Sequence, residues 1–331
     1  MKKKLIAMLL SAAMCLSLAA CGQKADTPDT TDPAEPSGDA ATYTVGICQL
    51  VQHEALDAAT QGFIDALNEA LPGQVKFEEK NASGDSNSCA TIVNGFVSEG
   101  VDLIMANATA ALQAAASATS DIPVLGTSIT AYGVALDIAD FSGTVGGNIS
   151  GTSDLADLSA QAQMILDWFP ETQKVGLLFC SAEPNSRYQI EEVAKYLADK
   201  GVETEEFAFT DTNDVASVTQ SAADYSDVVY IPTDNTAAAN TEAIGNVLIP
   251  AGIPAICGEE GICRGCGVAT LSISYYDLGV TTGKMAAKIL TGEANISEMP
   301  VEFTDATPKY NPSVCEQLGI TPLEGYEAIE G

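Results

Sequence analysis

The sequence is poor in positive charge. Its 331 residues contain 14 Lys and Arg against 45 Asp and Glu, which gives a formal net charge of −31. The arginines are Arg187 and Arg264, and the single histidine is His53. Nucleic-acid binding needs clustered Lys and Arg, so the composition excludes a protein that grips a phosphate backbone. It also excludes a His-rich metal site, and a Ser-His-Asp triad would have to use His53.

The sequence also lacks the short motifs that mark common enzyme and nucleotide sites. It has no GxSxG elbow, no GK[ST] phosphate loop and no GxGxxG after an apolar strand. The catalytic pattern that remains for an enzyme is a pair of acidic residues, and such pairs arise by chance in a chain with 45 acidic residues. We therefore expect no enzymatic activity, no cofactor and no bound metal.

Apart from these absences, the chain has the composition of a folded protein. Hydrophobic residues make up 46% and charged residues 18%, which excludes disorder along its whole length. At about 100–200 residues per domain, the length predicts two domains. The acidic balance by itself identifies no partner.

The first residues form a targeting segment. Lys2 to Lys4 are basic, and the apolar run from Leu5 to Leu18 is shorter than the about 20 residues of a membrane span. The run ends in Leu-Ala-Ala-Cys, which resembles the lipobox of bacterial lipoproteins. We predict a signal peptide at residues 1–20 and a lipid anchor at Cys21, on the outer face of the membrane of the bacterial cell envelope. The alternative is an ordinary signal peptide that happens to contain a cysteine.

Residues 21–42 are rich in Asp, Thr, Pro, Ala and Gly, and they predict a flexible tether. Beyond the tether, Cys48 and Cys180 end apolar runs and are predicted to be buried, unreactive thiols. The CxxC at residues 263–266 leaves a metal site, a local disulfide and free thiols open, although the usual second ligand pair of a metal site is absent. The seven cysteines after Cys21, an odd number that leaves at least one thiol free, are Cys48, Cys89, Cys180, Cys257, Cys263, Cys266 and Cys315.

Apolar runs alternate with helical patterns along the rest of the chain, which predicts βαβ units and parallel sheets. Strands are expected at 43–50, 75–80, 101–105, 122–125, 174–180, 203–210, 227–231, 254–256 and 268–271, with edge pieces at 134–136 and 148–150. Helices are expected at 56–71, 86–99, 110–118, 157–169, 185–200, 215–223, 237–248 and 276–290. The alternation restarts near residue 157, so the pattern predicts two α/β lobes of similar plan.

Polar residues follow these strands, where the carboxyl ends of parallel strands would meet at a cleft between the lobes. The first half offers hydroxyls, amides and helix starts, which suit an anionic group, and the second half offers carboxylates, which suit a cation. A zwitterionic solute matches both. For any single residue, an N-cap is the alternative to a ligand contact. The segments concerned are 49–54, 107–109, 127–130, 181–186, 232–236 and 258–260.

We assign roles to members of this set and to Tyr275. Amide and hydroxyl groups of the first half would hold the carboxylate of an amino acid: Asn107, Thr109 and Thr127. Carboxylates of the second half would hold its ammonium: Asp234, with Glu183 or Glu259. The side-chain pocket would be bordered by His53, Leu50 and Tyr275.

Five segments of the chain resemble the ABC-transporter substrate-binding lipoproteins of the TrpX-like group. They are VGICQLVQHEALD at 45–57, DLIMANAT at 102–109, GNISGTSD at 147–154, YIPTDNT at 230–236 and YYDLGVTTGKMAAKIL at 275–290. The likeness spans about residues 43–302. The sequence departs from the group's pattern at 52–54, 127–130 and 257–266, and the last departure falls on the ammonium side of the expected pocket.

The resemblance implies an α/β protein of the type I periplasmic-binding fold. Two Rossmann-like lobes with parallel sheets would be joined by a three-strand hinge, with crossings near Ser153, Ser274 and Phe303. The lobes would comprise 43–153 with 275–303, and 154–274 with 304–331. Carried over by motif position, the candidate ligand contacts are Gln49, His53, Asn107, Thr109, Thr127, Glu183, Asn185, Asp234 and Asn235.

Members of that group capture small molecules, often aromatic amino acids, and deliver them to a membrane permease. We therefore predict a solute-binding lipoprotein of an ABC importer, with an amino acid as its ligand and with the permease, its ATPase and the membrane as partners. No nucleic acid is expected. One alternative is a lobe that senses ligand for a signalling receptor. Another is an enzyme on the same fold, against which the missing nucleophile–base pair argues.

Overall fold

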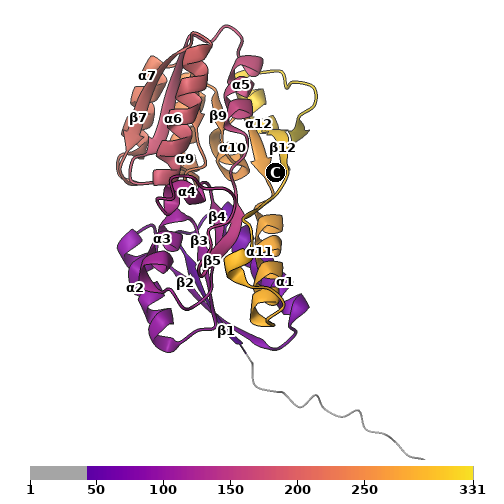
Figure 1. Ribbon diagram of the computed structural model, residues 1–331. Coiled ribbons are helices and arrows are strands. Elements are labelled where there is room, and N and C mark those ends of the chain that lie inside the picture. The colour runs from indigo at the N-terminus through magenta and orange to yellow at the C-terminus, as the bar shows by residue number, and fades with distance from the viewer. Residues whose placement is uncertain (1–42, 331) are drawn as a thin grey trace, which may run out of the picture. The chain divides into compact units, whose positions relative to one another are not determined.

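The computed structural model describes residues 43–330 of the chain. The predicted signal peptide, the lipidation site at Cys21 and the tether at 21–42 lie outside these residues. Within residues 43–330 the strands form two sheets, and each sheet with the helices that cover it makes one lobe (Figure 1). No helix of this described part is long and apolar enough to cross a membrane.

The first lobe contains a six-stranded sheet within the described residues. Its strands run in the order β11-β5-β4-β3-β1-β2, and every neighbouring pair is parallel. The strands are β1 (Tyr43–Gln49), β2 (Val75–Asn81), β3 (Leu103–Asn107), β4 (Val124–Ile129), β5 (Ile149–Ser153) and β11 (Glu302–Phe303). The helices are α1 (Glu54–Ala70), α2 (Ser86–Glu99), α3 (Thr109–Ala118), α4 (Tyr132–Ala135), α11 (Tyr275–Leu290) and the 3₁₀ turn η1 (Ile296–Glu298).

The second lobe contains a seven-stranded sheet within the same residues, in the order β13-β12-β10-β9-β8-β6-β7. The pair β10 and β12 is antiparallel, and the other pairs are parallel. The strands are β6 (Lys174–Cys180), β7 (Glu203–Phe209), β8 (Val228–Ile231), β9 (Ala255–Cys257), β10 (Ala269–Ile273), β12 (Ala306–Tyr310) and β13 (Glu327–Ala328). The helices are α5 (Leu158–Trp168), α6 (Pro184–Asp199), α7 (Val215–Tyr225), α8 (Asn235–Ala238), α9 (Thr241–Ala251), α10 (Glu260–Cys266) and α12 (Pro312–Leu318).

Helices cover both faces of each sheet, which is why the central strands are apolar throughout rather than alternating. In β3 every residue is buried. Ile104 points to the core shared with α2 and α3, whereas Leu103 and Met105 point to the core shared with α1 and α11. This two-sided burial confirms the predicted α/β class with largely parallel sheets.

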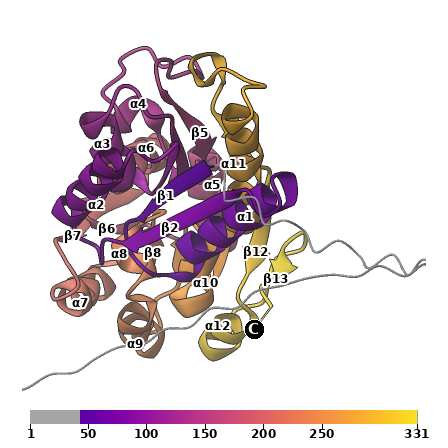
Figure 2. The same ribbon diagram turned by 90° about the horizontal axis from the view of Figure 1, so that it is seen from below.

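Helix α11 comes from a distant part of the chain and packs against α1 (Figure 2). The two helices approach closely at glycines. A Cβ atom at Gly62 would lie 2.1 Å from the carbonyl oxygen of Tyr276, and one at Gly279 would lie 2.0 Å from that of Ala59. This contact fixes the start of α1, where His53 lies, against the segment that enters from the second lobe.

The chain passes between the two sheets three times, as the predicted hinge requires. It leaves the first sheet after Ser153, returns between Ile273 and Tyr275, and leaves again between Phe303 and Ala306. We retain as a proposal the lobe bounds 43–153 with 275–303 and 154–274 with 304–331.

Two sequence predictions of local structure were wrong, and one helix was not predicted. The apolar triplet 134–136 was expected as an edge strand, but it belongs to α4 and its C-cap, because Tyr132 packs inward with its ring stacked on Phe141. The helix expected at 237–248 is broken into α8 and α9 at Asn240. The Cys-rich segment after β9, for which no element was predicted, contains helix α10, which Glu259 caps.

Candidate functional site

A small polar cavity lies between the lobes, where the carboxyl ends of both sheets meet. Its volume is about 10 Å³, which is room for about one water molecule. The first lobe and the hinge contribute His53, Leu56, Ser128, Thr130, Asp154 and Tyr275 to this interlobe cavity. The second lobe contributes Asn185, Thr233, Asp234, Asn235, Ala238 and Glu259.

A larger space, the outer cavity, adjoins the interlobe cavity at Asn235, which lines both. Its volume is about 260 Å³. Leu50, Val51 and Ala110 of the first lobe give it an apolar wall, and Glu183 of the second lobe gives it a polar one. The two lobes therefore enclose a polar inner space beside a roomier one of mixed character.

Ser128 enters the interlobe cavity because the backbone turns at the end of β4. Its φ of 56° lies in the left-handed region, and the pairing of β4 with β5 shifts register between Gly126 and Ile129. The side chain is buried, and its Oγ has no hydrogen-bond partner among the residues described. Backbone strain beside an unpartnered buried hydroxyl is typical of a binding site.

His53 joins the two lobes. It stands directly before α1, and its Nε2 lies 3.3 Å from Oδ1 of Asn235 at the start of α8. Burial lowers the pKa of His53, and the Asn235 contact and nearby acids, Glu183 foremost, oppose this effect. The imidazole is therefore neutral near pH 7, and it contributes no positive charge to the cavity.

Asp234 and Glu259 face the interlobe cavity as N-caps. Asp234 accepts the N–H groups of Cys180 and Ala237, both at 2.7 Å. Burial, with the Glu183 charge second, raises the pKa of Asp234 to about 8, and burial raises the pKa of Glu259 to about 7. None of the ion pairs within residues 43–330 involves either carboxylate.

Glu183 is directed into the second lobe and the outer cavity rather than the interlobe cavity. It accepts the backbone N–H groups of Asn235 at 3.0 Å and Thr236 at 2.9 Å. It also accepts Nδ2 of Asn235 at 2.7 Å and Oγ1 of Thr236 at 2.8 Å. These bonds orient Asn235, whose side chain reaches His53 across the cleft.

Asp154 reaches the interlobe cavity from the first hinge crossing. Its Oδ2 accepts the Tyr275 hydroxyl at 2.9 Å, and its Oδ1 has no hydrogen-bond partner within the described residues. Burial raises the pKa of Asp154 to about 6 despite the Tyr275 and Thr130 hydroxyls, which lower it. Asp154 is thus a buried carboxyl that lines the cavity and has one oxygen without a partner among the described residues.

Four sequence-predicted residues are buried in the first lobe but do not line the interlobe cavity: Gln49, Asn107, Thr109 and Thr127. Gln49 Oε1 accepts the hydroxyl of Thr60 at 2.7 Å, and Nδ2 of Asn107 donates to the carbonyl of Leu56 at 2.8 Å. These bonds hold the first turns of α1 against β1 and β3. Asn107 and Gln49 therefore hold in place the segment that contains His53 and Leu56, although they do not line the interlobe cavity themselves.

Thr127 belongs to a cluster of three hydroxyls inside the first lobe. Its Oγ1 lies 3.3 Å from that of Thr152 and accepts the hydroxyl of Thr282 at 3.2 Å. The cluster joins β4, β5 and α11. Thr109 begins α3 after Ala108, which has a φ of 90°.

Sequence reasoning missed several residues that line the interlobe cavity: Leu56, Asp154, Thr233 and Ala238. Asp154 ends the segment 147–154, which indicates the family but predicts no ligand contact. Thr233 lies in the 232–236 segment, which was recognised only as a set. A search for acids at the hinge crossings would have found Asp154.

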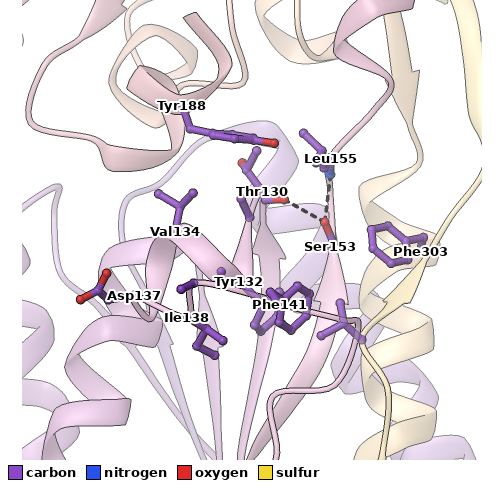
Figure 3. Close-up of a pocket in the computed structure, with 14 residues that line it drawn as sticks. Thr130, Tyr132, Val134, Asp137, Ile138, Phe141, Ser153, Leu155, Tyr188 and Phe303 are labelled. Atoms are coloured by element: carbon purple, nitrogen blue, oxygen red, sulfur yellow. Dashed lines mark hydrogen bonds between the residues drawn. The ribbon is translucent and has the colours of Figure 1, made fainter. Parts of the chain in front are cut away.

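A third cavity lies on the hinge side of the lobes and has a volume of about 630 Å³ (Figure 3). Tyr188 of α6 lies across it from Val134 and Phe303, which are 41% and 59% exposed. Ser153 Oγ donates to the carbonyl oxygen of Thr130 at 3.0 Å in its wall. Because Thr130 lines this cavity and the interlobe cavity, it separates a mainly apolar space from a polar one.

The cysteines of the described residues are free and buried, as expected for Cys48 and Cys180. Cys263 and Cys266 lie on α10 in one apolar core with Cys257. No group of three or more His, Cys, Asp or Glu side chains within residues 43–330 could hold a metal ion.

A family model described as ABC transporter substrate binding protein matches residues 44–326. A curated relative, the tyrosine-binding protein of Clostridioides difficile (strain R20291), is 30% identical over 309 residues, which is 92% of this chain and 89% of the relative.

Two of the solved structures that are similar to this chain were solved with and without a ligand. One is an ABC domain in complex with L-Trp from Streptococcus pneumonia, with a TM-score of 0.82, 32% identity, and coverage of 87% of this chain and all of that one. The other is the ligand-free, open structure of a substrate-binding protein with adhesive properties from Clostridium difficile. Its TM-score is 0.66 at 31% identity, over 87% of this chain and 99% of that one.

Proposed function

Because this chain belongs to the ABC transporter substrate binding protein family, we propose that it captures an aromatic amino acid between its lobes and delivers it to a membrane permease and its ATPase. The family is one of solute-binding proteins rather than enzymes. The names of two relatives support the ligand class, since one is a tyrosine-binding protein and the other was solved with L-Trp.

One observation carries the proposal: the interlobe cavity contains three buried carboxyls and no basic partner for them within residues 43–330. Asp154, Asp234 and Glu259 all line it, and none takes part in an ion pair among those residues. Buried carboxylates are stable when a positive charge or several donors meet them. A solute that brings its own ammonium supplies that charge.

The two cavities suggest how such a solute would lie. The charged backbone of an amino acid suits the interlobe cavity, with Ser128 and Thr130 as hydroxyl donors to its carboxylate. Its ring suits the outer cavity beside Leu50 and Val51. Asn185 and Asn235 would complete the second-lobe wall. Gln49, Asn107, Thr109 and Thr127 would then support the site rather than touch the solute.

The interlobe cavity of about 10 Å³ is too small for an amino acid, so the solute enters while the lobes are apart. The likeness to the L-Trp complex exceeds that to the ligand-free open structure, with TM-scores of 0.82 and 0.66 at nearly equal identity. This difference supports the view that the arrangement described here is close to the ligand-bound one.

We further propose that acylated Cys21 anchors the protein outside the cytoplasm, where substrate-binding proteins of ABC importers work. Metabolic labelling with an alkyne fatty acid tests this, with Cys21→Ser as the control. Label on the natural chain and none on the variant is the expected result. Equal labelling of both, or of neither, contradicts the anchor.

Calorimetric titration of ligand-depleted protein with each of the twenty amino acids tests the ligand class. We expect saturable heat with tyrosine, tryptophan or phenylalanine and a stoichiometry of one. Absence of heat with all twenty overturns the amino-acid ligand while leaving the family unaffected.

A further inference from the structure

The three carboxyls of the interlobe cavity differ in how many hydrogen bonds their oxygens already accept from the protein. Asp234 accepts two backbone N–H groups, from Cys180 and Ala237. Glu259 accepts two as well, from Gly261 and Ile262. Both are held by the second lobe as N-caps, so much of their hydrogen-bonding capacity is already taken.

Asp154 is the exception. It is 5% exposed, one oxygen accepts the Tyr275 hydroxyl at 2.9 Å, and Oδ1 has no partner among residues 43–330. Most buried polar atoms have partners, and an unpartnered carboxylate oxygen is costly. Because Asp154 lines a cavity, the missing donor can be one that a solute brings.

The surroundings of Asp154 favour a cationic donor. The groups that share its cavity are hydroxyls of Ser128, Thr130, Thr233 and Tyr275, amides, a neutral His53, and the acids Asp234 and Glu259. No Lys or Arg of the described chain pairs with Asp154. An ammonium forms stronger hydrogen bonds to carboxylate than neutral donors do.

Tyr275 determines which carboxylate oxygen of Asp154 is available to a ligand. Its ring is buried, and its hydroxyl binds Oδ2 of Asp154, which leaves Oδ1 as the oxygen that is free to meet a ligand. Asp154 lies on the first hinge crossing. Tyr275 lies at the end of the second crossing and is the first residue of α11. The hydrogen bond therefore ties two of the three crossings together beside the cavity.

We propose that Asp154 is the acceptor of the solute's ammonium and that Tyr275 is the residue that positions it. The inference rests on the proposed function, and it names the carboxyl that selects an amino acid over its deaminated counterpart. It places recognition of the solute's ammonium at the hinge, and not at the second-lobe acids Asp234 and Glu259. A ligand bound there contacts the segments about which the lobes rotate.

Two ligands and three variants test the proposal. The ligands are L-tyrosine and 3-(4-hydroxyphenyl)propanoate, which lacks the ammonium, or the corresponding tryptophan pair if tryptophan binds more tightly. Asp154→Asn keeps the shape and the acceptor for Tyr275, and Tyr275→Phe removes only the hydroxyl. Asp234→Asn is the matched control, because it changes a second carboxyl of the same cavity to an amide.

The natural protein is expected to prefer the amino acid by about 100-fold or more, since breaking a buried charge pair is costly. Asp154→Asn lowers affinity for the amino acid about 30- to 100-fold and leaves the deaminated analogue within about threefold, so the preference collapses. Tyr275→Phe lowers affinity for the amino acid about five- to tenfold and leaves the deaminated analogue within about threefold, so the preference shrinks in the same direction. Asp234→Asn changes both affinities alike, and the preference remains.

Retention of the full preference by Asp154→Asn, in protein that binds the amino acid, overturns the proposal. So does an equal loss for both ligands, which indicates a general disturbance of the cavity. If Asp154→Asn does not fold, Tyr275→Phe decides by the same criterion. A natural protein that binds no amino acid overturns the proposed function, and the assignment of Asp154 falls with it.

Discussion

Arg264 of α10 and Glu54 of α1 form an ion pair that crosses from the second lobe to the first. Of the ion pairs within residues 43–330, it is the one that joins the lobes. Arg264 also binds Glu260 on its own helix at 2.7 Å, so its guanidinium is held toward the cleft. The pair can form only when the lobes are together, and it therefore favours closure.

Removing this pair should weaken ligand binding slightly. Because both side chains are partly exposed, we expect Glu54→Gln to lower affinity about two- to fivefold, in keeping with about 0.2–1 kcal/mol for an exposed pair. Added salt should lower the ligand affinity of the natural protein more than that of the variant, since salt screens the ion pair. Calorimetric titration at low and high salt measures both effects.

Glu206→Gln is the matched control, because it removes the Arg187–Glu206 pair inside the second lobe. Its ligand affinity should equal that of the natural protein. An equal loss in both variants would mean that general surface charge, and not the interlobe pair, is responsible.

The contact between α1 and α11 should not tolerate a methyl group. Gly279→Ala places Cβ 2.0 Å from the backbone oxygen of Ala59, so one helix must move. We expect a loss of at least about 2 kcal/mol in the free energy of unfolding, as for overpacked cores. Denaturant titration followed by circular dichroism measures it.

Gly95 of α2 offers the contrast within the same lobe. A Cβ there meets nothing within 4 Å, so Gly95→Ala should stabilise the helix by about 0.5–1 kcal/mol. We expect the two substitutions to change the free energy of unfolding in opposite directions. A Gly279→Ala protein as stable as the natural one would show that the helices are not in close contact.

The ligand-free protein should lose stability as the pH rises. Burial raises the pKa of Asp154 to about 6, of Glu259 to about 7 and of Asp234 to about 8. Between about pH 4 and pH 8 the folded state therefore keeps protons that the unfolded chain has released, so the free energy of unfolding falls with pH. We expect Tm to drop by about 5 °C or more from pH 5.5 to pH 8.5, measured by thermal unfolding.

Asp234→Asn should flatten this dependence, because the amide does not titrate. Asp211→Asn, on an exposed loop of the second lobe, should leave it unchanged and serves as the control. A Tm that rises with pH in the ligand-free natural protein would show that the cavity acids are paired in a way the structure does not contain.

The buried thiols should be unreactive in the native protein. Burial raises the pKa of Cys180 and of Cys315 to about 11, so the reactive thiolate is scarce near neutral pH. Because all seven cysteines of the described residues are buried, we expect none of them to react with a thiol reagent until denaturant is added, as peptide mapping would reveal. A native peptide in which Cys257 is joined to Cys263 or Cys266 by a disulfide would contradict this.

Much of the fold could be predicted because burial on both sides of a parallel sheet leaves a clear signal. Strands such as 174–180 are continuous apolar runs, and the helices between them have one apolar face. The triplet 134–136 failed because three apolar residues fit a strand and a helical turn equally well. Only packing of Tyr132 on Phe141 decides between them.

The site could be predicted in outline, since carboxyl ends of parallel strands meet at one edge. His53, Asn185, Asp234, Asn235 and Glu259 do line the interlobe cavity. Side-chain direction could not be predicted: Asn107 and Thr127 point into the lobe, where Nδ2 of Asn107 donates to the Leu56 carbonyl and Oγ1 of Thr127 accepts the Thr282 hydroxyl. Asp154 was missed because it lies on a hinge crossing, and 45 acidic residues give no reason to choose one.

The most direct test of the central claim is a crystal structure of the protein with L-tyrosine or L-tryptophan, whichever binds more tightly. We predict the ligand between the lobes, with its ammonium about 3 Å from Oδ1 of Asp154 and its ring toward Leu50. A ligand bound outside the interlobe and outer cavities, or one whose ammonium contacts Asp234 or Glu259 instead of Asp154, would contradict it.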